Sequence, residues 1–163
     1  MVEMTLASIR VQMPDNVPVV LLKEVVEAGQ SGRTLPILIG HEEATAIARA
    51  IQGIEPPRPL THDLMRDLLG ALDVAIDAIV VTELRDAIFY AEIRMTSGGK
   101  PVVVSSRPSD AIALAVRTGT TIYAEDALLD SEAYLLQEDE EQEEVIEEFQ
   151  KFIEQVRPED FAS

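Results

Sequence analysis

The sequence predicts an α+β fold built on a mixed, mainly antiparallel sheet that we expect to be curved or barrel-like. Apolar and polar residues alternate through several short runs, which is the period of a strand. Between these runs, apolar residues recur every three or four positions, which is typical of a helix that buries one face. Glycine- and proline-rich turns separate the runs. The chain of 163 residues, 47% of them apolar, is long enough to enclose a hydrophobic core.

The first three strands are expected over residues 3–12, 17–26 and 34–39. In the first, Thr5, Ala7, Ile9 and Val11 fall on one side and Met4, Leu6, Ser8 and Arg10 on the other, which is the period of a strand. The second is apolar on both faces or nearly so. Turn-forming residues separate them at 13–16 and 28–32. Short strands joined by such turns are typical of an antiparallel meander.

Two helices are expected next, over residues 41–52 and 61–72. Glu42 and Glu43 fall in the first turn of the first helix, where the helix dipole favours acids. The connection contains three prolines within residues 54–59 and cannot be helix or central strand, because proline fixes φ and lacks an N–H donor. We therefore expect a stiff loop that ends at Thr61, a plausible N-cap.

A second meander is expected over residues 74–84, 89–95 and 102–104, followed by a helix over 109–118 and a short strand over 120–123. This order of strands and then an alanine-rich helix with an acid near its start resembles the first part of the chain. Two interpretations stay open, namely a repeated unit and a chance similarity between alanine-rich helices.

The sequence predicts a domain over residues 1–136, followed by an acidic segment and a helix over 137–163. Residues 145–156 predict an amphipathic helix. Its apolar stripe consists of Val145, Ile146, Phe149, Phe152, Ile153 and Val156. This stripe requires a partner surface, either on the same domain or on another protein in helix-in-groove binding.

Charge and composition limit the function classes. The formal net charge is −17, and such a surface repels nucleic acid at long range, which favours a cationic or protein partner. The chain has no cysteine, so disulfides and thiolate metal sites are excluded, as is usual for the cytoplasm. No apolar run approaches the roughly 18 residues of a membrane span, so we expect a cytoplasmic protein without membrane contact.

The most distinctive stretch runs from Ser105 to Arg117. Arg107, Pro108, Ser109 and Asp110 lie where a strand passes into a helix. A helix N-terminus carries unpaired N–H groups and a partial positive charge, so it suits an acid or a bound anion. The alternative is purely structural, with Ser106 or Ser109 as the cap and with Arg107 paired to Asp110.

Three motifs in this order resemble the bifunctional nuclease family. They are Arg107-Pro108-Ser109-Asp110-Ala111-Ile112-Ala113-Leu114-Ala115, Arg58-Pro59-Leu60-Thr61-His62-Asp63-Leu64, and Leu35-Pro36-Ile37-Leu38-Ile39-Gly40 followed by Glu42-Glu43-Ala44. The resemblance covers roughly residues 5 to 130. It implies a compact α+β domain, often a homodimer, with nuclease activity on DNA and RNA. The family usually has an aspartate where this chain has Ser105, which puts one metal ligand in doubt.

These motifs supply the candidate site residues. The candidate catalytic residues are His62, Asp63, Asp110 and Arg107. The candidate ligands for Mg²⁺ or Mn²⁺ are Glu43, Asp63 and Asp110, because these ions prefer carboxylate oxygens. The candidate substrate-binding residues are Arg58, Arg107 and Ser109. The alternative is that the motifs hold the fold together through ion pairs between Arg107 and Asp63 and between Arg58 and Asp110.

The function expected from this sequence is a low-specificity nuclease that cuts DNA or RNA phosphodiesters with a divalent metal. Only two histidines are present, which excludes a histidine-rich metal site, and aromatic residues are 4%, too few for a base-stacking platform. The second hypothesis is a non-enzymatic interaction or regulatory protein that uses the acidic surface and the C-terminal helix.

Overall fold

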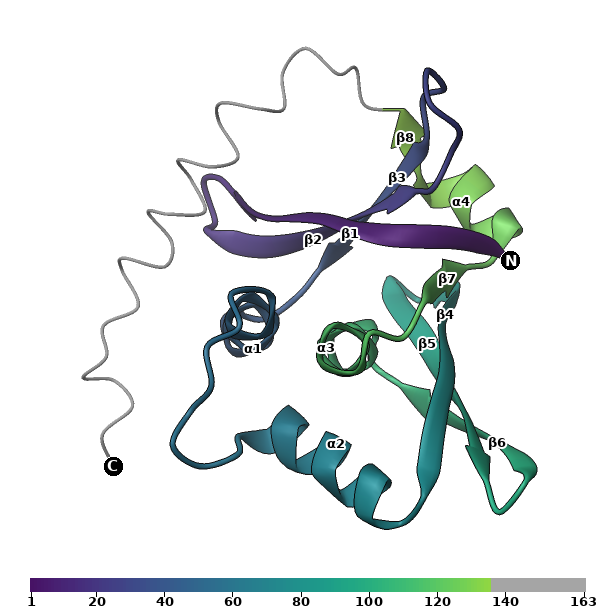
Figure 1. The fold of residues 1–163 in the computed structure, drawn as a ribbon. Coiled ribbons are helices and arrows are strands. Elements are labelled where there is room, and N and C mark those ends of the chain that lie inside the picture. Colours follow the sequence, from purple (N-terminus) through teal and green to yellow (C-terminus); the bar gives the residue numbers. More distant parts are fainter. Residues whose placement is uncertain (136–163) are drawn as a thin grey trace.

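The computed structural model describes residues 1–135, which form an α+β fold with one eight-stranded sheet and four helices (Figure 1). The strands are β1 (Val2–Gln12), β2 (Val17–Glu24), β3 (Arg33–Leu38), β4 (Val74–Arg85), β5 (Ile88–Ser97), β6 (Lys100–Ser106), β7 (Ile122–Ala124) and β8 (Tyr134–Leu135). The helices are α1 (His41–Ile51), α2 (Thr61–Ala71), α3 (Pro108–Thr118) and α4 (Asp126–Glu132). The predicted class is confirmed.

The sheet consists of the two predicted meanders, β1–β2–β3 and β4–β5–β6, joined by β7. β7 pairs antiparallel with β1 and parallel with β4, which makes the sheet mixed. The strand order is β6-β5-β4-β7-β1-β2-β3-β8, so β6 and β8 are the two edges. The sheet is open, and the expectation of a curved or barrel-like sheet is wrong. The two edge strands, β6 and β8, are not neighbours in the strand order, so the sheet does not close. β8 also has only two residues with which to pair.

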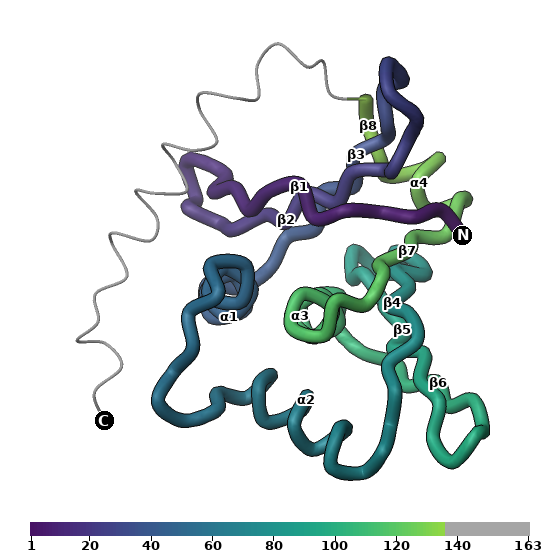
Figure 2. The backbone as a smooth tube through the Cα atoms, in the orientation of Figure 1, coloured from purple at the N-terminus to yellow at the C-terminus, as the bar shows by residue number. Residues whose placement is uncertain are grey.

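α3 is the central helix of the fold. It packs against α1 and α2 and also against β4 and β5 (Figure 1). Residues 52–60 carry the chain from α1 round to α2, as the tube in Figure 2 shows. Most of the candidate site residues lie at the N-termini of α1, α2 and α3. The packing of these three helices therefore decides which of the residues meet.

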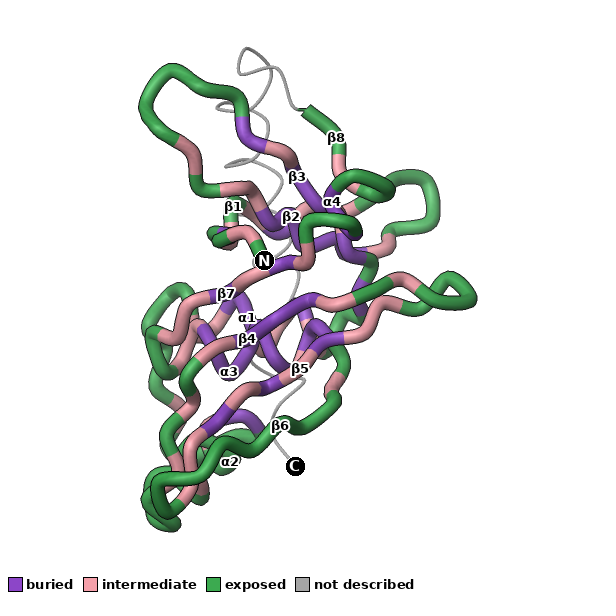
Figure 3. Tube along the Cα trace, turned by 90° about the vertical axis from the view of Figure 1, so that its right-hand side faces the viewer, coloured by how far each residue is buried: buried purple, intermediate pink, exposed green. Residues whose placement is uncertain are grey.

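The core lies between the sheet and α3. Buried segments follow α3 and the middle of β4 and β5, whereas β6 and most of α2 are exposed (Figure 3). Ala111, Ala113 and Ala115 are all buried, and their small side chains let α3 approach its neighbours closely. Gly119 ends α3 in the left-handed conformation at φ 69°, which glycine adopts without strain.

Two described elements, α4 and β8, follow the last strand that the sequence predicts. Arg33 holds α4 in place. The guanidinium of Arg33 donates to Glu24 at 2.9 Å, to Asp126 at 2.8 Å and to Asp130 at 2.7 Å. No periodicity reveals such a long-range charge cluster.

The acidic segment and the helix expected over residues 145–156 lie outside the described residues. Within residues 1–135, none of the helices has the length and apolar character needed to cross a bilayer.

Candidate functional site

Three helices begin with an acid at their third position. These acids are Glu43 in α1, Asp63 in α2 and Asp110 in α3. The partial positive charge of a helix N-terminus stabilises a carboxylate there. Pro108 starts α3, and Arg107 before it is extended, so the predicted serine cap is absent. Because α3 packs against both α1 and α2, Glu43 and Asp110 reach a common cleft.

α2 and α3 meet through a contact between His62 and Asp110. His62 Nε2 lies 3.0 Å from Asp110 Oδ1, and the imidazole is buried. A carboxylate can only accept here, so Nε2 carries the proton, and in the neutral imidazole the lone pair is then on Nδ1. No hydrogen bond to Nδ1 is found within residues 1–135, and His62 lines a cleft on the surface. His62 is therefore placed to accept a proton.

Arg107 connects α3 to α1, and it binds the same Asp110 carboxylate as His62 does. Its Nε donates to Asp110 Oδ2 at 2.7 Å, and its Nη1 donates to Glu43 Oε1 at 2.7 Å. The second oxygen of Glu43 lies over Gly40, where a Cβ would come within 2.1 Å of it. A glycine before α1 thus leaves room for the carboxylate that holds Arg107. The Arg107 side chain is still 64% exposed, so its guanidinium can bind an anion from solvent.

A cleft of about 660 Å³ opens over these side chains. Its charged lining consists of Glu42, Glu43, Asp110, Arg49, Arg107 and Arg117, with His62 and Thr61 beside them. Acids and arginines are equal in number there, whereas the whole chain has a net charge of −17. This cleft therefore repels an anion less than an average part of the surface does.

The family model of the bifunctional nuclease domain matches residues 19–137, a range that contains α1, α2, α3 and every residue lining the cleft. This chain belongs to the bifunctional nuclease domain family. Two relatives come from Mycobacterium tuberculosis, Uncharacterized protein MT1877 of strain CDC 1551 / Oshkosh and Uncharacterized protein Rv1829 of strain ATCC 25618 / H37Rv. Each is 43% identical over 167 residues, which cover 98% of this chain and 97% of the relative. Neither name assigns an activity.

Asp110 of this bifunctional nuclease domain is held in its charged form. Burial raises the pKa of Asp110, but the bonds from Arg107 and His62 outweigh burial and hold the pKa below its usual range. The same carboxylate, followed by Glu43, raises the pKa of the Arg107 guanidinium above its ordinary value. Asp110 is therefore a negatively charged hydrogen-bond partner for His62 at neutral pH.

Asp63 lies apart from the cleft of the bifunctional nuclease domain. One oxygen accepts from Arg117 Nε at 2.6 Å, and the other accepts from the backbone N–H of Leu60 at 3.0 Å. Asp63 lines a second depression of about 400 Å³, on the side where Arg66 and Glu55 lie. The predicted pair between Arg107 and Asp63 is wrong, because Arg117 takes that place.

Three other predicted positions also lie off the cleft lining. Ser109 is buried in the first turn of α3. Arg58 is exposed in the loop before α2, and it forms no ion pair with any described residue, Asp110 included. Ser105 is exposed in β6 opposite Glu92. Ser105, the position at which the resemblance implies an aspartate, is therefore not part of the cleft wall.

The carboxylates do not fit the expected Mg²⁺ or Mn²⁺ site. Within residues 1–135, no group of three or more histidine, aspartate or glutamate side chains is placed to hold a metal ion. Glu43 and Asp110 both bind the guanidinium of Arg107, and Asp63 binds Arg117 instead. The metal requirement therefore stays a prediction.

Sequence reasoning missed Arg117, the side chain that connects the three helices. Besides its bond to Asp63, it donates to the carbonyls of Ala113 at 2.9 Å and Ala46 at 3.0 Å. Its side chain is only 5% exposed. The available signal was an arginine that directly follows an uninterrupted apolar run, residues 111–116, in the last turn of a helix. Such a charge must find a buried partner.

We expect the free energy of unfolding to fall in acid because of Asp63 and Asp110. Burial raises the pKa of Asp63, but the bonds from Arg117 and Leu60 outweigh it, so both folded pKa values lie below the ordinary 3.8. Their stabilisation is complete above the unfolded pKa and is lost as the pH falls through the folded pKa. Urea unfolding at a series of pH values below about 5 measures this loss.

The matched variant for this measurement is Asp63→Asn, which keeps an oxygen for the Leu60 N–H. Its free energy of unfolding should fall less steeply in acid than that of the wild type. Comparing the two slopes largely cancels the effect of acid on the net charge of the whole chain. If the free energy of unfolding changes with pH equally in the variant and in the wild type, folding does not lower the pKa of Asp63.

Proposed function

We propose that this protein is a nuclease of low sequence specificity that hydrolyses DNA or RNA phosphodiesters in the cleft at the N-termini of α1, α2 and α3. The observation that carries the proposal is the pair of Asp110 and His62, next to an arginine that faces solvent. Phosphodiester hydrolysis needs an activated water and a cation against the phosphate. In the cleft, His62 would be the base for the water and Arg107 the cation for the phosphate, and both side chains bind Asp110.

In this proposal, His62 is the general base. Its Nδ1 takes a proton from a water molecule, whose oxygen attacks the phosphorus. Asp110 is a positioning residue, because it fixes the tautomer of His62 and stabilises the imidazolium. Arg107 binds the non-bridging oxygens as negative charge develops on them. The bond to the leaving oxygen then breaks, and the imidazolium or solvent returns a proton to that oxygen.

The lining of the cleft also supports low specificity. No tryptophan, tyrosine or phenylalanine is among the described residues that line it, so bases have no aromatic surface on which to stack. Recognition would therefore depend on phosphate and sugar, which carry no sequence information. The acidic surface adds a long-range repulsion, so we expect binding to be weak.

The homodimer implied by the family resemblance is also a proposal. It is supported by β6, an edge strand in which Val102, Val103 and Val104 are 39%, 56% and 44% exposed. An apolar edge strand with unpaired backbone groups is a template for pairing with another strand. Pairing of β6 with β6 of a second copy would bury these valines.

The test of the proposed function is cleavage of single- and double-stranded DNA and RNA by the purified full-length protein. Parallel reactions contain Mg²⁺, Mn²⁺ or a chelator, which also decides the metal requirement. Arg107→Gln should lower kcat/KM at least about tenfold, because the guanidinium no longer neutralises the phosphate. Arg85→Gln is the matched control, since Arg85 is 58% exposed and lies on the hairpin of β4 and β5.

Two results would contradict the proposal. If the protein cuts no nucleic acid under any of these conditions, the interaction or regulatory hypothesis becomes the better account. If Arg107→Gln and Arg85→Gln both cut at the wild-type rate, the activity comes from a contaminant or from another part of the chain.

A further inference from the structure

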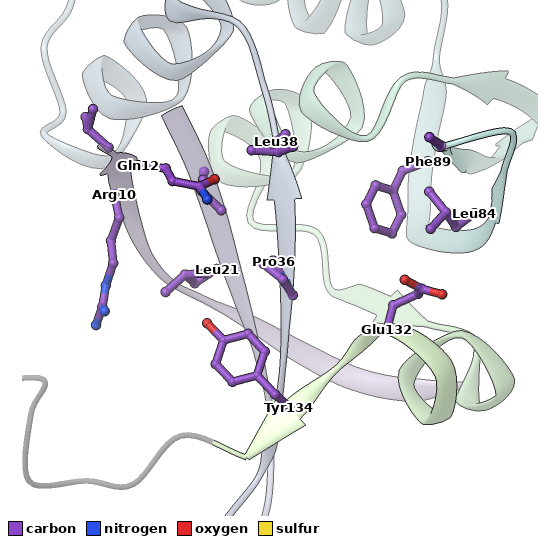
Figure 4. A pocket seen from close by; sticks show the side chains of 12 residues that line it. Arg10, Gln12, Leu21, Pro36, Leu38, Leu84, Phe89, Glu132 and Tyr134 are labelled. Atoms are coloured by element: carbon purple, nitrogen blue, oxygen red, sulfur yellow. The ribbon is translucent and has the colours of Figure 1, made fainter. Parts of the chain in front are cut away.

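A further depression, lined largely by apolar side chains, lies away from the cleft. It has a volume of about 650 Å³ and is mainly lined by β1, β2, β3 and the hairpin of β4 and β5, with Tyr134 at its border. Figure 4 shows Leu21, Pro36 and Leu38 on one side and Leu84 and Phe89 on the other. We call this depression the apolar groove.

The apolar groove lies on the face of the sheet opposite to α1, α2 and α3. Val20 and Leu22 of β2 belong to the core beneath those helices. Successive side chains of a strand point to opposite faces, so Val19 and Leu21 point to the other face, where they line the groove. Val19 and Leu21 are buried, whereas Leu38 at the edge of the groove is 62% exposed. This face is therefore apolar, and its edge at Leu38 is incompletely covered by residues 1–135.

The described chain ends beside this groove. Tyr134 lines it and belongs to β8, which pairs with β3. Residues 136–163 follow directly from that position. The acidic stretch 137–144 can span at most about 29 Å when fully extended, since a residue adds at most 3.6 Å. A segment that begins at residue 145 can therefore reach the groove without crossing the molecule.

The sequence of residues 145–156 complements such a surface. Six apolar residues recur at helical spacing, and two of the four phenylalanines of the chain are among them, Phe149 and Phe152. Each such side chain gains about 1.5–3 kcal/mol when it leaves water. The short connection gives this segment an effective concentration of the order of millimolar at the groove, which favours it over a partner in dilute solution.

We propose that residues 145–156 form a helix that packs its apolar stripe into the apolar groove of the same molecule. The acidic residues of its other face then point to solvent. This places much of the −9 net charge of residues 137–160 on the side of the sheet opposite to the cleft. The proposal assigns a function to the groove that does not depend on whether the cleft is a nuclease site.

Site-directed crosslinking in the full-length protein tests this proposal. Because the chain has no cysteine, two introduced cysteines are the only thiols. The test variant combines Leu38→Cys in the groove with Phe149→Cys in the C-terminal segment, and a short bismaleimide joins thiols that lie close together. The control combines Phe149→Cys with Leu68→Cys, because Leu68 is 53% exposed on α2, which lies far from β3 in Figure 1.

The expected result is crosslinking within one molecule, at least about tenfold faster for the groove pair than for the control pair and unaffected by dilution. Equal rates for both pairs, or products that join two molecules and disappear on dilution, would overturn the proposal. The second of these results would assign the groove to a second copy.

The Tm of variants with a single replaced residue gives an independent check. Phe152→Asp should lower the Tm, because it removes an apolar side chain from the groove. Gln150→Asp, on the polar face of the same predicted helix, should leave the Tm unchanged. Equal Tm values for both variants and the wild type would contradict the proposal.

Discussion

His62→Gln is expected to lower kcat for phosphodiester cleavage by about a thousandfold, in the range that removal of a general base produces. Glutamine places an amide nitrogen close to the position of Nε2, so the hydrogen bond to Asp110 Oδ1 can persist. The nitrogen that accepts a proton, Nδ1, has no counterpart in glutamine. The variant therefore removes the proposed base while keeping the contact that joins α2 and α3.

His41→Gln is the control for this experiment, because His41 and His62 are the two histidines of the chain. His41 is exposed at the start of α1 and does not line the cleft. We expect it to cut at the wild-type rate. Thermal unfolding of both variants shows whether each is folded, so that a loss of rate in His62→Gln can be assigned to chemistry.

The pH dependence separates a base from a structural residue. If His62 takes a proton from water, the wild-type rate should depend on pH in a way that the residual rate of His62→Gln does not. A folded His62→Gln variant that keeps the wild-type rate and pH profile would exclude His62 as the base.

The sequence predicted most of the fold because its elements are encoded locally. The six strands of the two meanders and the helices α1, α2 and α3 follow from alternation, helical spacing and turn residues. The openness of the sheet could not be predicted in this way. It depends on how β7 joins the meanders, and a three-residue strand carries no sign of pairing with β1 and β4.

The candidate site was predicted in part, for a similar reason. Local sequence indicated acids at helix starts, and the structure brings Glu43, His62, Arg107 and Asp110 together. Local sequence does not indicate the direction in which a side chain at a helix start points. Asp63 follows His62 directly, yet it turns to Arg117. Adjacent residues on a helix lie about 100° apart, so the two cannot face the same partner.

Arg117→Met is expected to lower the free energy of unfolding by about 3–5 kcal/mol, the usual cost of removing one partner of a buried ion pair. The side chains of Arg117 and Asp63 are only 5% and 13% exposed. Methionine fills part of the space but leaves the Asp63 carboxylate without its cation. It also leaves the carbonyl of Ala46 without the guanidinium N–H. The Tm should fall by about 10 °C or more for a chain of this length.

Arg66→Met is the matched control, because Arg66 and Asp67 form an ion pair in which both side chains are nearly half exposed. Surface pairs of this kind contribute at most about 1 kcal/mol, so its Tm should stay close to that of the wild type. The double variant Asp63→Asn, Arg117→Met should recover part of the lost stability. Asparagine has no charge to bury, and its side-chain oxygen can still accept from the N–H of Leu60.

These variants also distinguish a residue that holds the site in place from a residue that takes part in the reaction. Arg117 donates to groups on α1, α2 and α3, the three helices whose N-termini form the cleft. Losing it should therefore loosen the positions of Glu43, His62 and Asp110 together. Activity should fall along with stability in Arg117→Met, whereas in His62→Gln activity should fall with little change in Tm. If Arg117→Met unfolds at the wild-type temperature, the buried pair does not hold the three helices together.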